Sequence, residues 1–279
     1  MLNRIKNYII LTRPLNVIIG MLSIFIGAFI TGTVSPLFKV FLASLSGGIV
    51  AGGANAINDY FDVEIDKINK PHRPIAAGVI SPANGFIYSI ILFLLGIIIG
   101  WFVNRQAFVV AIFASILLFF YSAKLKRTVL WGNLSVSLAT SLAFIYGGIA
   151  VNRFALSLIP ATFSFFYHLG REIIKDAEDI EGDIADNIVT FPIKYGKKPA
   201  LKLATVIYLF LILLTILPYT FQVFGLYYLF IVTLVVDLVV VYVLFSMWRD
   251  MSTKHLSRLA IILKLNMFAG LIAIYCGRF

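Results

Sequence analysis

The chain has 279 residues, of which 61% are hydrophobic and only 13% are charged. This composition, with a mean hydropathy of +0.97, excludes an ordinary soluble domain and is typical of a protein that crosses a membrane several times. The net charge of +10 does not indicate nucleic-acid binding, because the basic residues cluster beside the ends of apolar runs. Cys276 is the only cysteine, so the chain forms no internal disulfide.

Nine apolar runs are long enough to cross a bilayer, since a spanning helix needs about 17–25 residues. We expect helices because backbone groups in lipid must pair within their own segment, and the alternating pattern of barrel strands is absent. The expected spans are residues 15–33, 38–60, 84–103, 107–123, 132–151, 154–175, 200–221, 226–248 and 259–277. The predicted fold is therefore all-α, a polytopic membrane protein with nine transmembrane helices in a bundle. The first run lacks a small-residue cleavage site and is interpreted as a retained helix.

The lysines and arginines predict how the chain is oriented. With the N-terminus placed in the cytoplasm, eighteen of them fall on the inner side and four on the outer side. This asymmetry follows the positive-inside rule. A multi-pass protein of the cell membrane with nine spans then has its C-terminus outside.

Acidic residues are scarce, and eleven of the thirteen lie within residues 59–66 and 172–186. We call residues 58–66 the first acidic cluster and residues 176–183 the second acidic cluster; each follows the end of an apolar run. Carboxylates this close repel one another unless a cation joins them. The clusters therefore predict a divalent metal site on the cytoplasmic side.

The two clusters are related by a fixed offset. Asp62 and Asp66 form a D-x-x-x-D pair that returns 117 residues later as Asp179 and Asp183, and a P-I-x-x-G run at 74–78 returns 118 residues later. We interpret the chain as one transmembrane domain, residues 1–279, with a four-helix repeat at about 14–123, a second at about 132–248, and a last helix at about 259–277. Repeats in one orientation place both clusters on one membrane face.

The residue types of the clusters favour Mg²⁺. Spacings of four residues predict that Asn58, Asp62 and Asp66 share one face of a helix. Hard oxygen ligands suit Mg²⁺ or Mn²⁺ rather than zinc, and Mg²⁺ combines a few carboxylates with phosphate oxygens. The guest is therefore expected to be a phosphorylated or diphosphorylated substrate. The candidate metal ligands are Asn58, Asp59, Asp62, Asp66, Asp176, Asp179 and Asp183.

Basic residues at the same helix ends would take the remaining charge of a diphosphate. The candidate phosphate-binding residues are Arg13, Asn16, Arg73, Lys124, Lys126 and Arg171. Arg13, Asn16 and Arg171 either bind an acceptor's phosphate or line the cavity. Lys124 and Lys126 remain alternatives for one position.

These motifs resemble those of the UbiA superfamily of intramembrane prenyltransferases. The resemblance rests on N-D-x-x-D-x-x-x-D at 58–66, D-x-x-x-D at 179–183, T-R-P-x-N at 12–16, H-R-P-I at 72–75, and Tyr121 with the following lysines. It covers nearly the whole chain, although the family's Y-x-x-x-K spacing is not kept because position 125 is leucine. The resemblance implies Mg²⁺, an isoprenyl diphosphate donor and a lipophilic acceptor.

Within the superfamily, residues 170–183 are most similar to the archaeal synthases of digeranylgeranylglyceryl phosphate. That similarity implies transfer of a geranylgeranyl group from geranylgeranyl diphosphate to the hydroxyl of geranylgeranylglyceryl phosphate, a step in archaeal ether phospholipid biosynthesis. The residues expected to act in catalysis are Asp62, Asp66, Asp179, Asp183 and Tyr121. Tyr121 would face a carbocation through its ring, or else it belongs to the interfacial aromatic belt.

Two other functions fit part of the pattern. The first is a prenyltransferase with an aromatic acceptor, as in quinone biosynthesis. The second is a cation transporter, since membrane acids and repeats also mark transporters. Transporter acids usually lie at mid-membrane, where only Asp237 is expected, so the cluster positions favour an enzyme. A purely structural membrane protein has little support.

Overall fold

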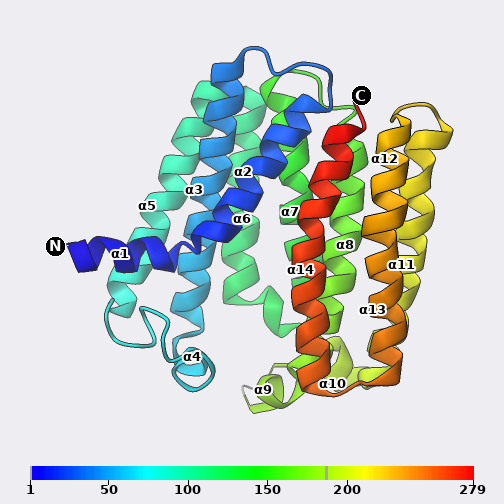
Figure 1. Cartoon of the computed structure of the whole chain (residues 1–279). Helices are drawn as coiled ribbons and strands as arrows, with labels where there is room; N and C mark the ends of the chain where they lie inside the picture. The colour runs from blue at the N-terminus through cyan, green and yellow to red at the C-terminus, as the bar shows by residue number, and fades with distance from the viewer. Residues whose placement is uncertain (1, 186–187) are drawn as a thin grey trace. The chain divides into compact units, whose positions relative to one another are not determined.

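The computed structural model describes residues 2–185 and 188–279, and every regular element in these ranges is a helix. Figure 1 shows the helices in chain order. They belong to two compact units: Met1–Leu125 with Leu142–Phe154, and Lys126–Ser141 with Ala155–Phe279. The all-helical part of the predicted fold is confirmed.

The first unit is built around one long helix. It contains α1 (Leu2–Leu11), α2 (Pro14–Phe29), α3 (Leu37–Phe61), α4 (Val63–Asn69), α5 (Pro82–Val103), α6 (Arg105–Ala123) and the second half of α7 (Trp131–Ala150). Helix α3 packs against α2, α5 and α6. Ser46 on α3 donates to the carbonyl oxygen of Gly96 on α5 at 2.7 Å. Such small residues let helix backbones approach closely in a membrane.

Helices α2 and α7 touch backbone to backbone through two glycines. A Cβ atom built on Gly27 would overlap the carbonyl oxygen of Phe144, and one built on Gly147 would overlap the carbonyl oxygen of Ile24. Only glycine leaves room for this contact. The sequence positions of both glycines, inside apolar helices, thus reflect packing rather than helix propensity.

The second unit holds the first half of α7 and the C-terminal helices. These are α8 (Leu158–Glu178), α9 (Ile180–Ala185), α10 (Phe191–Tyr195), α11 (Lys197–Thr220), α12 (Leu226–Ile231), the π-helix η2 (Val232–Asp237), α13 (Leu238–Arg249) and α14 (Thr253–Cys276). Helix α8 packs against α11 and α14. Tyr167 on α8 donates to the carbonyl oxygen of Leu263 on α14 at 2.8 Å, and Tyr208 on α11 donates to the carbonyl oxygen of Tyr167 at 3.1 Å.

Seven helices in the described ranges are long and apolar enough to cross a membrane. They are α3, α5, α6, α7, α11, the continuous run Leu226–Arg249 and α14. An eighth span arises if α1 and α2, which meet at a bend of 57°, count together. The predicted count of nine is therefore not confirmed by length and composition. The chain is an integral membrane protein, since these helices match the bilayer in length and apolar character.

The remaining predicted span, 154–175, is a helix whose C-terminal end is charged. Its counterpart α8 carries Arg171, Glu172, Lys175 and Asp176 in its last turns and so is not among the apolar spans. Residues 154–175 were predicted to be a span because the first half of this run is apolar. Charges at one end of a helix lower its mean hydropathy without shortening it.

Candidate active site

The first acidic cluster lies at a helix break. Helix α3 ends at Phe61, and Asp62 follows with φ −97° and ψ 8°, before α4 begins at Val63. The Asp62 N–H donates to the Asn58 carbonyl at 3.0 Å, and the Asp66 N–H donates to the Asp62 carbonyl at 2.7 Å. The helix predicted from the spacing is interrupted at Asp62, which leaves helical geometry while the backbone hydrogen bonds of the helix persist.

The second acidic cluster has the same backbone arrangement. Helix α8 ends at Glu178, Asp179 follows with φ −91° and ψ 13°, and α9 begins at Ile180. The Asp179 N–H donates to the Lys175 carbonyl at 2.9 Å, and the Asp183 N–H donates to the Asp179 carbonyl at 2.9 Å. In each unit, the first aspartate of D-x-x-x-D therefore caps a long helix and the second lies on a short one.

A chain of ion pairs links the first cluster to two arginines. Arg13 forms an ion pair with Asp59 through Asp59 Oδ1. Arg73 Nη1 lies 3.1 Å from the same Oδ1 atom and 2.5 Å from Asp66 Oδ2. Asp59 and Asp66 are each only 3% exposed. Buried carboxylates require such partners, since an unpaired buried charge is strongly unfavourable.

The other residues of the first cluster have different surroundings. Asn58 donates from Nδ2 to Asp62 Oδ2 at 2.8 Å, and both side chains are half-buried. Glu64 is exposed and forms a surface ion pair with Lys67 at 2.8 Å. A surface pair of this kind contributes little, so Glu64 is not part of the buried network.

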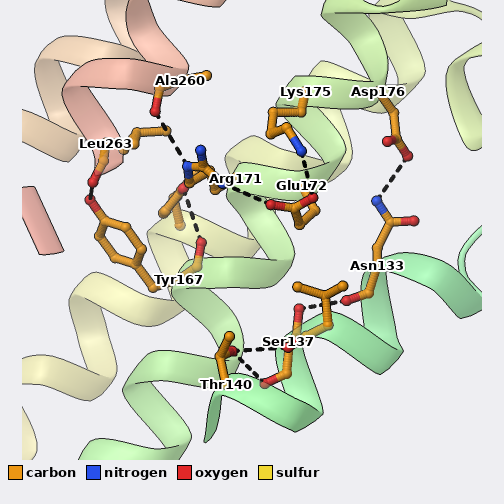
Figure 2. Close-up of polar contacts among 12 residues, drawn as sticks. Asn133, Ser137, Thr140, Tyr167, Arg171, Glu172, Lys175, Asp176, Ala260 and Leu263 are labelled. Carbon is orange, nitrogen blue, oxygen red and sulfur yellow. Dashed lines mark hydrogen bonds and ion pairs between the residues drawn. The ribbon is translucent and has the colours of Figure 1, made fainter. Parts of the chain in front are cut away.

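The second cluster lies beside a buried network on α8, which Figure 2 shows. Asn133 on α7 donates from Nδ2 to Asp176 Oδ2 at 2.8 Å. Glu172 accepts from Arg171 Nη1 at 2.8 Å and from Lys175 Nζ at 3.0 Å. Arg171 also donates from Nε to the carbonyl oxygen of Ala260 on α14 at 3.3 Å.

Sequence reasoning assigned no role to Glu172 or Asn133. The only signal for Glu172 was an acid with a lysine three residues later inside an apolar helix, a spacing that brings the two side chains together. Nothing in the sequence around Asn133 pairs it with Asp176. The contact joins residues 43 positions apart, so no local pattern encodes it.

The structure brings four predicted site residues into one network: Arg13, Asp59, Asp66 and Arg73. Two more predicted residues of the first unit are half-buried, Asn16 in the first turn of α2 and Tyr121 near the end of α6. Lys124 is exposed at the C-cap of α6, and Lys126 is half-buried in the 3₁₀ turn η1 (Leu125–Arg127). In the second unit Asp179 is exposed, and Asp176 and Asp183 are half-buried.

The donor chemistry of both clusters fits a hard divalent cation. Across the described ranges, no three His, Cys, Asp or Glu side chains converge as a preformed metal site. Mg²⁺ does not need one, because it binds through one or two carboxylates together with substrate phosphate oxygens and water. Asp62, Asp179 and Asp183 lie near helix ends and are half-buried or exposed, so a cation can approach them from solvent.

Comparison with known proteins gives one consistent picture. Residues 20–269 match the UbiA prenyltransferase family. A digeranylgeranylglyceryl phosphate synthase of Methanosphaera stadtmanae is 35% identical over 270 residues, covering 97% of this chain and 98% of the relative. A solved structure reported as digeranylgeranylglyceryl phosphate synthase is 32% identical with a TM-score of 0.79, covering 99% and 98%. A UbiA homologue of Archaeoglobus fulgidus, bound to GPP and Mg²⁺, has a TM-score of 0.71 at 20% identity, covering 96% and 99%.

Proposed function

The chain belongs to the UbiA prenyltransferase family, and we propose on that basis that it builds a diprenyl glycerol phosphate in the membrane. It transfers a geranylgeranyl group from geranylgeranyl diphosphate to the hydroxyl of geranylgeranylglyceryl phosphate. The observation that carries this proposal is the match along almost the whole chain to a synthase of this product. The same match favours a lipid-phosphate acceptor over an aromatic one, and an enzyme over a cation transporter.

Nine transmembrane helices remain the arrangement we propose. The seven apolar helices are joined by the bent pair α1–α2 and by α8, whose charged end would lie at the membrane surface. The basic residues, eighteen on one side against four on the other, support a cytoplasmic N-terminus and cytoplasmic acidic clusters. The equal backbone geometry of the two D-x-x-x-D pairs supports their origin as repeated units.

The donor's diphosphate would be held by oxygen ligands through Mg²⁺ and by cations directly. The proposed Mg²⁺ ligands are Asn58, Asp62, Asp66, Asp176, Asp179 and Asp183, whereas Asp59, the remaining predicted ligand, is buried against Arg13 and Arg73. When bound, Mg²⁺ supplies positive charge that makes the diphosphate a better leaving group. Arg73, with Lys124 or Lys126, adds direct contacts to the phosphate oxygens, since guanidinium groups bind them in a bidentate manner. The proposed acceptor-phosphate contacts are Arg13, Asn16 and Arg171.

The proposed reaction is a substitution at the allylic carbon of the donor. The allylic C–O bond breaks with its electron pair passing to the diphosphate, and the carbon becomes cationic. The acceptor hydroxyl oxygen attacks that carbon to form the ether bond, and the hydroxyl proton passes to the released diphosphate. The ring of Tyr121 would stabilise the developing cation by about 0.5–2 kcal/mol. Apolar helices around the site would exclude water, which otherwise captures the cation.

A competition between acceptors tests this assignment. Purified protein receives radiolabelled geranylgeranyl diphosphate with either geranylgeranylglyceryl phosphate or an aromatic acid as acceptor. We expect label in the lipid phosphate, with release of one diphosphate per product. Label in the aromatic product alone would indicate a prenyltransferase with an aromatic acceptor, as in quinone biosynthesis. Metal flux into liposomes without donor or product would favour the transporter.

A further inference from the structure

One carboxylate oxygen collects two arginines from distant parts of the chain. Arg13 lies between α1 and α2, Asp59 lies near the end of α3, and Arg73 lies in the segment after α4. Both guanidinium groups contact the same atom, Asp59 Oδ1. Asp59 therefore fixes the positions of these two arginines relative to each other.

The arginine at the α1–α2 bend has an unusual backbone conformation. Arg13 has φ 53° and ψ 72°, the left-handed region that non-glycine residues rarely occupy. Asn55, one turn before Asp59 on α3, donates to the carbonyl oxygen of Thr12 at 2.8 Å. Two successive turns of α3 thus contact the bend, one through the amide of Asn55 and the other through the carboxylate of Asp59.

The same contacts leave part of Arg13 available. Its side chain is 30% exposed and uses only Nη2 toward Asp59. No hydrogen bond from its other nitrogens to the described residues is present. A guanidinium carries five N–H donors in a rigid fork, so a group fixed at one end presents its remaining donors in a defined direction.

Asp59 itself differs from a metal ligand. Its side chain is 3% exposed and is paired with two guanidinium groups, whereas the side chain of Asp62 is half-buried. A metal at Asp59 would have to displace two guanidinium groups from a buried oxygen. Displacing them would cost Arg13 its ion pair and leave Arg73 paired with Asp66 alone.

We propose that Asp59 is a positioning residue that aims Arg13 and Arg73 at the substrates' phosphate groups and does not ligate Mg²⁺. This inference rests on the proposed function and revises the sequence-based assignment of Asp59 as a metal ligand. Within the first acidic cluster, Asp62 would then bind the metal, and Asp59 would orient the two arginines.

The first test measures metal binding without turnover. Mn²⁺ binding to the full-length protein in detergent is followed by electron paramagnetic resonance for Asp59→Asn, Asp62→Asn and the exposed control Glu64→Gln. We expect Asp62→Asn to weaken Mn²⁺ binding about tenfold or more, as loss of a ligand does, while Asp59→Asn and Glu64→Gln stay within about twofold of wild type. A loss of Mn²⁺ affinity in Asp59→Asn as large as in Asp62→Asn overturns the proposal.

The second test separates binding from chemistry. Asp59→Asn and Arg13→Gln should each raise KM for a phosphate-bearing substrate about tenfold, with kcat much less affected, because a charge-assisted contact made in the ground state is lost. The double variant should be less impaired than the product of the two single effects, since both remove one arrangement. Unchanged KM in both single variants contradicts the inference.

The outcomes also distinguish this inference from the proposed function. If Asp62→Asn binds Mn²⁺ normally and no prenyl product forms in wild type, the proposed function fails. If product forms and Asp59→Asn loses Mn²⁺ affinity as expected for loss of a metal ligand, the positioning role alone fails. Should Asp59→Asn not fold, Arg13→Gln keeps Asp59 paired with Arg73 and still carries the KM test.

Discussion

At the scale of single residues, similar carboxylates acquire different roles from their partners. Asp59 is buried against two arginines, Asp62 accepts from an amide, and Glu172 is held between an arginine and a lysine. The sequence places all three near the ends of long helices without distinguishing them. Their chemistry depends on which cation or amide the fold brings to each oxygen.

Glu172 is predicted to be a structural charge. Replacing it with Gln leaves Arg171 and Lys175 without their shared carboxylate beside α14. Loss of one partner in a buried pair costs about 3–5 kcal/mol, so Glu172→Gln should lower Tm markedly in a detergent unfolding assay. Glu64→Gln, which removes an exposed surface pair, should change Tm by little. Equal Tm values for the two variants would show that the Glu172 network does not stabilise α8.

Asn133 is predicted to orient Asp176. Its amide donates to Asp176 Oδ2 at 2.8 Å, as an outer partner does for a metal-binding carboxylate. Loss of such a partner typically weakens metal binding about 10–100-fold, so Asn133→Ala should weaken Mn²⁺ binding in that range. Asn133→Asp, which replaces the donor with a second acid, should not restore the contact at neutral pH. Wild-type Mn²⁺ affinity in Asn133→Ala would remove Asp176 from the ligand set.

Much of the candidate site was predictable because acids are rare in this chain. Asp62, Asp66, Asp179 and Asp183 stand out by repetition against an apolar background. The contact between Arg13 and Asp59 joins residues 46 positions apart, and no spacing rule links them. Partners of this kind follow from tertiary packing, which a single sequence does not encode locally.

At the scale of elements, the long helices were predictable and their breaks were not. The predicted span 38–60 is α3, Leu37–Phe61, and the predicted span 84–103 is α5, Pro82–Val103. Apolar length determines such helices almost alone. The breaks at Asp62 and Asp179 depend on two dihedral angles each, and spacing arguments that assume one continuous helix pass over them.

The α2–α7 contact offers a prediction about packing. Gly147→Ala places a methyl group against the Ile24 carbonyl oxygen, whereas Gly20→Ala on α2 meets nothing within 4 Å. Overpacking a close helix contact costs about 1–3 kcal/mol or more, so Gly147→Ala should lower Tm by several degrees. Gly20→Ala should leave Tm unchanged or raise it slightly, because alanine favours helix. The reverse order of Tm values would contradict the described contact.

At the scale of the whole molecule, hydropathy and charge identify a polytopic membrane protein, but they do not determine the number of spans. Seven helices qualify by length and composition, eight with the bent pair, and nine only if α8 with its charged end also crosses. An even number would return both termini to one side, and nine would separate them. The family follows from paired motifs along the chain, which is why it was predictable where the helix count was not.

Sidedness can be measured with single cysteines in a Cys276→Ser background. Lys70→Cys lies after the first acidic cluster and Arg278→Cys lies at the C-terminus. A membrane-impermeant maleimide should label position 278 in intact cells and position 70 only after permeabilisation. Labelling of both positions from the same side would exclude the nine-helix arrangement.

The central claim is that both D-x-x-x-D pairs serve one metal-dependent prenyl transfer. The direct measurement is formation of digeranylgeranylglyceryl phosphate by wild type, Asp62→Ala and Asp179→Ala, each with Mg²⁺ or with EDTA. We predict product only from wild type with Mg²⁺, with rates at least about 100-fold lower in either variant because charge stabilisation of the leaving diphosphate is lost. Product formation that persists in EDTA, or in both variants at the wild-type rate, would contradict the claim.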